Sequence, residues 1–222
     1  MSSIPKIQLP ANRPFNLIVA GVGGQGILLA ARLIAKAAFL DGLIVSIGET
    51  FGASRRGGTV LSHIRFTITH QEKSVSRKIP LTGSLVPCSM ADVLVGLEPL
   101  ETLRAAPYLN PQSVVLLNTQ FQPPIDVIAN KAKTITFSTI QSRLSNLVAK
   151  LWSINALQLA KAAGEIRTVN TIMVGALAGL QITPISQSAF KLAISDQFEN
   201  ETVQKMNVKA YHFGLNYVTK NT

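Results

Sequence analysis

Apolar positions in this 222-residue chain form short runs and longer periodic stretches, which predict alternating strands and helices. Short runs rich in branched residues predict strands at 15–20, 43–47, 59–69, 92–97, 113–119 and 133–137, and an extended segment at 74–79 is expected to pair back as a hairpin arm. Helical spacing and start signals predict helices at 27–40, from Pro99, at 142–163, at 170–180, after Pro184 and from Asn200 or Thr202.

The order of these elements predicts a single domain. The first half alternates as βαβ with added strands, and the last third is helical. We therefore expect a single three-layer α/β/α domain with a mixed, mostly parallel sheet and a C-terminal helical layer, over residues 14–219. Residues 1–13 are polar and are expected to form a flexible arm. Helical spacing predicts these core-facing positions in the last helix: Val203, Met206, Ala210, Phe213 and Tyr217.

Composition narrows the class of protein. With 47% hydrophobic and 14% charged residues, the chain has the material for a packed core and is not of a disordered type. The net charge is +10, which is compatible with a basic surface that has no specific meaning. Lys and Arg are scattered and show no recognition-helix pattern, which argues against nucleic acid, and an acidic partner or a phosphate-rich ligand fits at least as well. The single cysteine, Cys88, excludes an internal disulfide, an iron–sulfur cluster or a structural zinc built by this chain alone.

The expected location is the cytoplasm. A chain with one cysteine is typical of a reducing compartment. Residues 1–13 lack the charged-then-apolar layout of a signal peptide. The longest weakly polar run, at 171–180, is too short to span a bilayer, so no membrane association is expected.

A glycine-rich segment, Gly21-Val22-Gly23-Gly24-Gln25-Gly26, follows the first expected strand and opens the first expected helix. This placement suits a phosphate group, because glycines let the backbone approach a ligand and the helix presents free N–H groups. The candidate binding residues are Gly21, Gly23, Gly24, Gln25 and Gly26. The alternative is that the glycines only allow the strand and the helix to pack closely.

A second glycine-rich segment covers residues 48–58. Arg55 and Arg56 stand there beside Gly57 and Gly58, and guanidinium groups on a glycine loop suit a clamp for phosphate or carboxylate. They suit a salt bridge to a partner chain equally well, and a solvated loop without any partner is the remaining interpretation. Arg56, Gly57 and Gly58 join the candidate residues of the phosphate site.

A free-standing NAD-type dinucleotide-binding oxidoreductase is the principal alternative. Glu49 follows the second expected strand, near the place where such enzymes bind the ribose hydroxyls. The second strand, however, leads through a loop directly into the third, without the crossover helix that a dinucleotide fold requires. This feature argues against the NAD alternative.

No catalytic residue or metal ligand set is predicted. The chain shows no Ser/His/Asp arrangement, no paired carboxylates and no metal-ligand spacing. His63 shares a strand face with Arg65 and is expected to be a hydrogen-bonded structural histidine. Gly175 and Gly179 lie four residues apart on one expected helix, where they allow close helix packing.

Five segments in this order resemble the gamma-type domain of the 2-oxoacid:ferredoxin oxidoreductases, and most closely the beta subunit of the indolepyruvate enzymes. The segments are GVGGQGILLA (21–30), GETFGASRRGGTVLSHIRF (48–66), ADVLVGLEPLETLRAAPYL (91–109), VVLLNT (114–119) and VNTIMVGALAGL (169–180). The similarity covers about residues 14–217. The run at 53–56 and the segment 78–90 depart from the family pattern, which leaves the partner and the substrate open.

The resemblance implies a subunit that binds no cofactor alone. It implies a complex that oxidatively decarboxylates an aryl-2-oxoacid such as indolepyruvate to an acyl-CoA and passes electrons to ferredoxin. Thiamine diphosphate, Mg and iron–sulfur clusters would belong to a large alpha subunit. This chain would pack beside the active site and close over CoA. The isolated chain is then expected to be inactive, as a monomer or a homodimer. A purely structural partner subunit is the remaining alternative.

Overall fold

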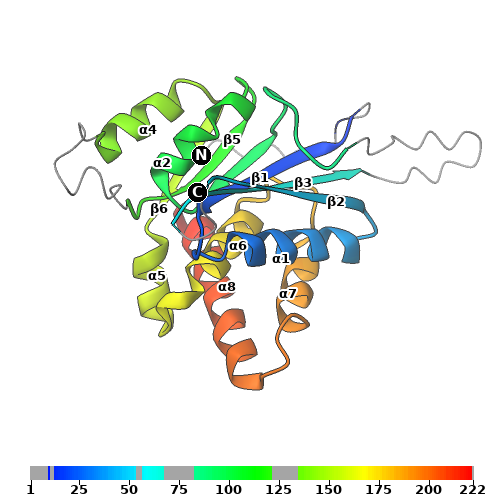
Figure 1. The fold of residues 1–222 in the computed structure, drawn as a ribbon. Helices are drawn as coiled ribbons and strands as arrows, with labels where there is room; N and C mark the ends of the chain where they lie inside the picture. Colours follow the sequence, from blue (N-terminus) through cyan, green and yellow to red (C-terminus); the bar gives the residue numbers. More distant parts are fainter. Residues whose placement is uncertain (1–9, 11–12, 54–56, 68–82, 122–134, 222) are drawn as a thin grey trace, which may run out of the picture.

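A mixed six-stranded sheet forms the centre of the molecule (Figure 1). A computed structural model describes residues 10, 13–53, 57–67, 83–121 and 135–221. The strands are β1 (Phe15–Val22), β2 (Ile44–Phe51), β3 (Thr59–Thr67), β4 (Val93–Gly96), β5 (Val114–Asn118) and β6 (Lys150–Ile154), in the order β2-β3-β1-β4-β5-β6. Strand β3 is antiparallel to both β1 and β2, whereas β1, β4, β5 and β6 run parallel. This confirms the mixed α/β sheet.

Helices cover both faces of the sheet, as the three-layer prediction requires (Figure 1). Helices α2 (Pro99–Arg104) and α4 (Phe137–Ser145) lie on one face. The other face carries α1 (Ile27–Leu40), α5 (Ala156–Ala163), α6 (Val169–Leu180), α7 (Gln187–Ser195) and α8 (Glu201–Asn221). Two short 3-10 turns, Ala106–Tyr108 and Ile166–Thr168, complete the described elements.

Several local sequence signals act as predicted. Pro99 occupies the first turn of α2, and the Glu98 carboxylate caps this helix by accepting the Glu101 N–H at 2.8 Å. Gly164 ends α5 in the left-handed conformation, with φ +103°. Asn200 accepts the N–H groups of Thr202 and Val203, which starts α8 where the sequence placed it.

The predicted helix at 142–163 is wrong. The structure divides this stretch into the end of α4, strand β6 and helix α5. Its central run, residues 147–154, is apolar without a clear period, so pairing with β5 decides its conformation. Asn155 then begins α5, because its side chain accepts the N–H of Gln158 at 3.0 Å.

The predicted strand at 133–137 is also wrong in its described part. Ile135 and Thr136 are not in a strand, and Phe137 begins α4. The hydroxyl of Thr136 caps that helix by accepting the N–H of Thr139 at 3.2 Å. Residues 133–134, like the predicted hairpin arm at 74–79, lie outside the described residues.

Strand β2 is longer and more exposed than predicted. It runs to Phe51 rather than ending at residue 47, so Glu49 lies within a strand and not in a loop. Because β2 is an edge strand, Ile44, Ile47 and Phe51 are each 39–44% exposed instead of buried. The extension matters for the site, since it brings Phe51 level with the start of α1.

Helices α6 and α8 pack at very short distance, as predicted from Gly175 and Gly179. A Cβ on Gly175 would collide with the carbonyl of Tyr211, and a Cβ on Gly179 would lie 2.8 Å from the carbonyl oxygen of Leu215. Gly214 in α8 meets α6 in the same way, at Ile172. The buried residues of α8 are therefore Asn207, Ala210, Tyr211, Gly214 and Val218. Of the five predicted core positions only Ala210 is among them, because the face of α8 that meets α6 carries Ala210, Gly214 and Val218.

Candidate functional site

The first glycine loop, residues 21–26, joins β1 to α1 at the carboxyl end of the parallel strands. Gly24 and Gly26 have φ values of +108° and +80°, which glycine adopts at low cost. Gly26 caps α1 without any side-chain hydrogen bond. The first N–H groups of this 14-residue helix are therefore available to a ligand.

The second glycine loop, residues 52–58, is hydrogen-bonded to the first. The N–H of Gly23 donates to the carbonyl of Gly58 at 2.9 Å, and the N–H of Gly57 donates to the carbonyl of Gly23 at 3.2 Å. Antiparallel pairing of Val22 with Thr59 brings the loops to the same edge of the sheet. The two glycine motifs that the sequence separates by about 30 positions thus form one structure.

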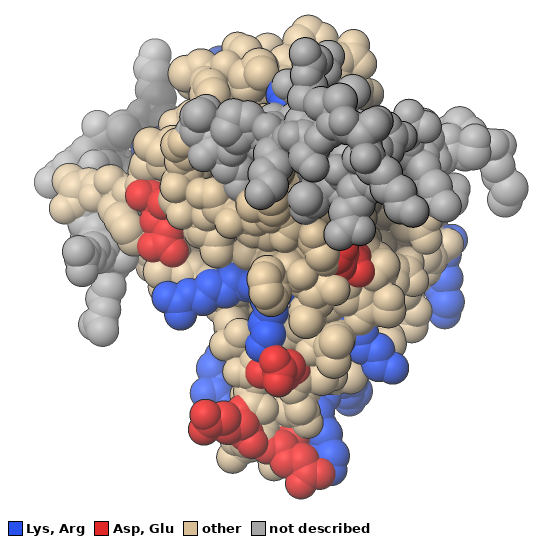
Figure 2. Space-filling model, turned by 90° about the vertical axis from the view of Figure 1, so that its right-hand side faces the viewer, with Lys and Arg blue, Asp and Glu red and all other residues tan. Residues whose placement is uncertain are grey.

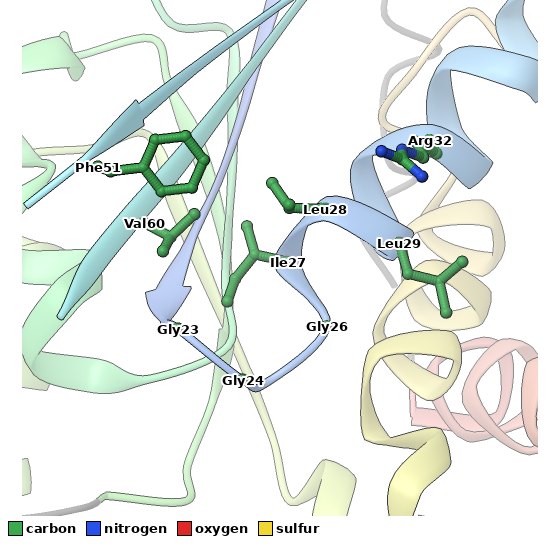
Figure 3. A pocket seen from close by; sticks show the side chains of 9 residues that line it. All are labelled: Gly23, Gly24, Gly26, Ile27, Leu28, Leu29, Arg32, Phe51 and Val60. Carbon is green, nitrogen blue, oxygen red and sulfur yellow. The ribbon is translucent and has the colours of Figure 1, made fainter. Parts of the chain in front are cut away.

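A pocket of about 390 Å³ opens beside the first glycine loop (Figure 3). Its glycine wall consists of Gly23, Gly24 and Gly26. The other lining residues are Ile27, Leu28, Leu29 and Arg32 of α1, Phe51 of β2 and Val60 of β3. Figure 3 shows the Phe51 ring and Arg32 on different sides of the pocket, with Leu28 and Ile27 between them. The pocket combines backbone donors, an aromatic ring and a cation.

Electrostatics at the pocket favour an anion. The N-terminus of α1 carries the positive end of the helix dipole. Arg32 lies five residues further along α1 and is exposed, and within the described part of the chain it forms no hydrogen bond or ion pair. A phosphate group fits these surroundings, and the apolar side chains of Phe51 and Leu28 suit a less polar portion of the same ligand.

The predicted site residues that the structure describes divide into three groups. Gly23, Gly24 and Gly26 line the pocket, whereas Gly57 and Gly58 hold the first loop from behind. Gly21 and Gln25 belong to the packing of the loop, because the Gln25 side chain accepts the N–H of Val22 at 2.9 Å and covers Gly21. Arg56 lies outside the described residues.

Sequence reasoning missed Arg32, Phe51 and Asn170. The glycine motifs do not point to Arg32, and the predicted strand at 43–47 is too short to include Phe51. Asn170 is the second residue of α6, 144 positions after Gly26, and contacts it. The position of Arg32 on the helix that follows the loop was an available signal, but the contact of Asn170 depends on tertiary structure.

His63 is a structural residue, as predicted. It is fully buried, and its Nδ1 accepts the N–H of Val86 at 3.3 Å. Burial lowers the pKa of His63, which keeps the ring neutral. The segment that carries Val86 crosses the sheet face at β2 and β3, where Gly83 accepts a hydrogen bond from Arg65 and Ser84 bonds Ser46.

Other classes of site receive no support from the described residues. They contain no group of three His, Cys, Asp or Glu side chains that could hold a metal ion. No helix among them is long and apolar enough to cross a bilayer. On the face shown in Figure 2, Lys and Arg side chains lie apart from one another with acidic side chains between them. Glu49, the carboxylate of the NAD alternative, is exposed and does not line the pocket.

Comparison with known proteins gives one consistent result. The family model described as pyruvate ferredoxin/flavodoxin oxidoreductase matches residues 16–217. Indolepyruvate oxidoreductase subunits IorB of Archaeoglobus fulgidus and Thermococcus kodakarensis are 34% and 32% identical, over 90% and 91% of this chain and 94% and 95% of theirs. The pyruvate synthase subunit PorC of Methanocaldococcus jannaschii is 29% identical over 90% of this chain and 94% of its own.

Solved structures share the fold. The gamma subunit of a keto/oxoacid ferredoxin oxidoreductase from Geobacter sulfurreducens has a TM-score of 0.64 at 19% identity, covering 93% of this chain and 99% of its own. A 2-oxoglutarate:ferredoxin oxidoreductase from Magnetococcus marinus, solved with 2-oxoglutarate, coenzyme A and succinyl-CoA, has a TM-score of 0.68 at 23% identity. The matched region covers 95% of this chain and 32% of the Magnetococcus chain.

Proposed function

The chain belongs to the pyruvate ferredoxin/flavodoxin oxidoreductase family, and from this membership we propose that it is the small subunit of an indolepyruvate:ferredoxin oxidoreductase. The observation that carries the proposal is the identity of 30–34% with four IorB subunits, each over nine tenths of both chains. Subunits named for pyruvate or ketoisovalerate are 25–30% identical. The complex would oxidise an aryl-2-oxoacid to an acyl-CoA and reduce ferredoxin.

The reactive cofactors are proposed to lie on a larger partner subunit. Four thiolates are needed for a typical iron–sulfur cluster, and this chain has one cysteine. The described residues contain no group of three His, Cys, Asp or Glu side chains that could hold a metal ion either. Thiamine diphosphate would supply the carbanion chemistry of decarboxylation, and this chain would form one wall of the shared active site.

The proposed contribution of this chain is to hold the phosphate end of CoA. The diphosphate would accept hydrogen bonds from the N–H groups at Gly24 and at the start of α1. Arg32 would neutralise a further phosphate, and Phe51 would stack on the adenine base. Gly57 and Gly58 would support the first glycine loop through their hydrogen bonds to Gly23, and Arg56 stays a candidate for the phosphate from the sequence alone. Held in this way, the thiol end of CoA is left to reach the reacting carbon on the partner.

Reconstitution with the large subunit tests the proposal. We expect acyl-CoA formation and reduction of a dye acceptor only when both chains are present, with the highest kcat/KM for indolepyruvate among indolepyruvate, pyruvate and 2-ketoisovalerate. A higher kcat/KM for another 2-oxoacid would overturn the substrate assignment. Activity of the isolated chain, or none in any mixture, would overturn the assignment as an accessory subunit.

A further inference from the structure

Gly26, the last residue of the first glycine loop, is not held by the hydrogen bonds that fix residues 22–25. Residues 22–25 are fixed by the Gln25 side chain and by the two hydrogen bonds to the second loop. Gly26 takes no part in these bonds, although its carbonyl accepts the first helical N–H, that of Ala30, at 3.0 Å. The peptide that precedes the free N–H groups of α1 therefore lacks the hydrogen bonds that hold the rest of the loop.

Asn170, in the first turn of α6, contacts this peptide. It is 4% exposed, and its amide nitrogen donates to the Gly26 carbonyl at 3.4 Å. The side chain also fills the space where a Cβ on Gly26 would project, since such a Cβ would lie 3.1 Å from its Cγ and closer still to its nitrogen. Asn170 thus contacts Gly26 at its carbonyl and at its Cα, and leaves no room there for a larger side chain.

Asn170 is itself held rigidly. Its side-chain oxygen accepts the N–H of Thr171 at 2.9 Å, which leaves the amide nitrogen directed at Gly26. The hydroxyl of Thr171 donates to Asn207 of α8 at 2.7 Å, and Asn207 in turn donates to the carbonyl of Val203 at 2.9 Å. These buried polar groups anchor the support to the closely packed pair α6 and α8.

We infer that Asn170 is a positioning residue, which acts through Gly26 to orient the ligand-binding N–H groups at the start of α1. Asn170 is not among the residues that line the pocket, so its effect on a ligand is indirect. The inference rests on the proposed function for the identity of the ligand, CoA. It assigns a role to a residue far from the glycine motifs in sequence.

Kinetics of the reconstituted complex test this role with the isosteric variant Asn170→Asp. This variant keeps the oxygen that accepts the N–H of Thr171 but loses the donor to Gly26. We expect the KM for CoA to rise about tenfold, with kcat at saturating CoA and the KM for the 2-oxoacid within about twofold of wild type. Asn170→Ala, which removes the donor without adding a negative charge near the anion site, should show the same pattern; if it fails to fold, Asn170→Ser is the neutral replacement.

Tyr211→Phe is the matched control. It also removes one hydrogen bond from a buried side chain of the helical layer, the bond to the Gln187 carbonyl at 3.1 Å, but it lies away from the loop. We expect a similar loss of thermal stability and no change in the KM for CoA. Equal CoA KM values in Asn170→Asp and Tyr211→Phe, or a loss of kcat alone, would overturn the inference.

Amide hydrogen exchange separates this inference from the proposed function. If the wild-type complex needs no CoA, the proposed function fails, but the positioning role still predicts faster exchange of the Ala30 N–H, which is bonded to the Gly26 carbonyl, in Asn170→Asp than in Tyr211→Phe. Equal exchange of this N–H in the two variants would reject the role of Asn170 whatever the ligand is.

Discussion

At the scale of single residues, Arg32 is the charged side chain that lines the pocket, and its charge is available to bind a ligand. Arg32→Ala should raise the KM for CoA about fivefold, because an exposed ion pair with phosphate contributes on the order of 1 kcal/mol. Lys36→Ala is the control, since Lys36 lies one turn further along α1 and is paired with Asp196 at 2.6 Å. Steady-state kinetics of the complex measure both. An equal effect of the two variants would show only a dependence on overall charge.

His63 makes stability depend on pH in a definite direction. Burial lowers its pKa in the folded state below the ordinary value of 6.5, so the unfolded chain binds the proton more readily. The contribution of His63 to stability is therefore complete above about pH 6.5 and is lost as pH falls below it.

The expected observation is a fall in Tm from pH 7 to pH 5 that is smaller in His63→Gln, which retains an acceptor for the Val86 N–H. Thermal melts at several pH values would measure it. An identical pH dependence of Tm in wild type and variant would contradict the contribution of His63 to the loss of stability in acid.

At the scale of elements, the contact between α6 and α8 is the least tolerant of added volume. Gly175→Ala would place a methyl group against the carbonyl of Tyr211, so we expect a loss of about 1–3 kcal/mol in the free energy of unfolding. Chemical denaturation measures the loss. Lys161→Ala, at an exposed position of α5, should change stability by less than about 0.5 kcal/mol. Wild-type stability in Gly175→Ala would mean that the two helices can move apart freely.

Sequence reasoning recovered the elements whose local signals agree with their packing. The first glycine loop and α1 follow directly from the apolar run at 15–20, the glycines and the Ala- and Leu-rich stretch after them. It failed at β6, because residues 147–154 carry no period and only the open edge of β5 makes them a strand. It found the glycines of the site but not Phe51 or Asn170, since strand length and contacts across 144 positions are set by the tertiary structure.

At the scale of the whole molecule, the pocket distinguishes two classes of ligand. CoA at about one hundred times its Kd should stabilise the isolated chain by roughly 2.7 kcal/mol and raise its Tm, because it binds only the folded state. NAD(H) at the same concentration should leave the Tm unchanged, since the carboxylate that would bind its ribose lies outside the pocket. Thermal melts with each ligand decide between them. A shift with NAD(H) and none with CoA would restore the dinucleotide alternative.

The insertion of β3 between β1 and β2 also governs how the binding site comes into being during folding. Both glycine loops are correctly juxtaposed only when Val22 faces Thr59, and a slip of one residue would turn every side chain of β3 to the opposite face. Refolding chains should therefore recover affinity for their ligand no earlier than this central pairing forms. Ligand affinity would then report on completion of the sheet rather than on collapse or helix formation.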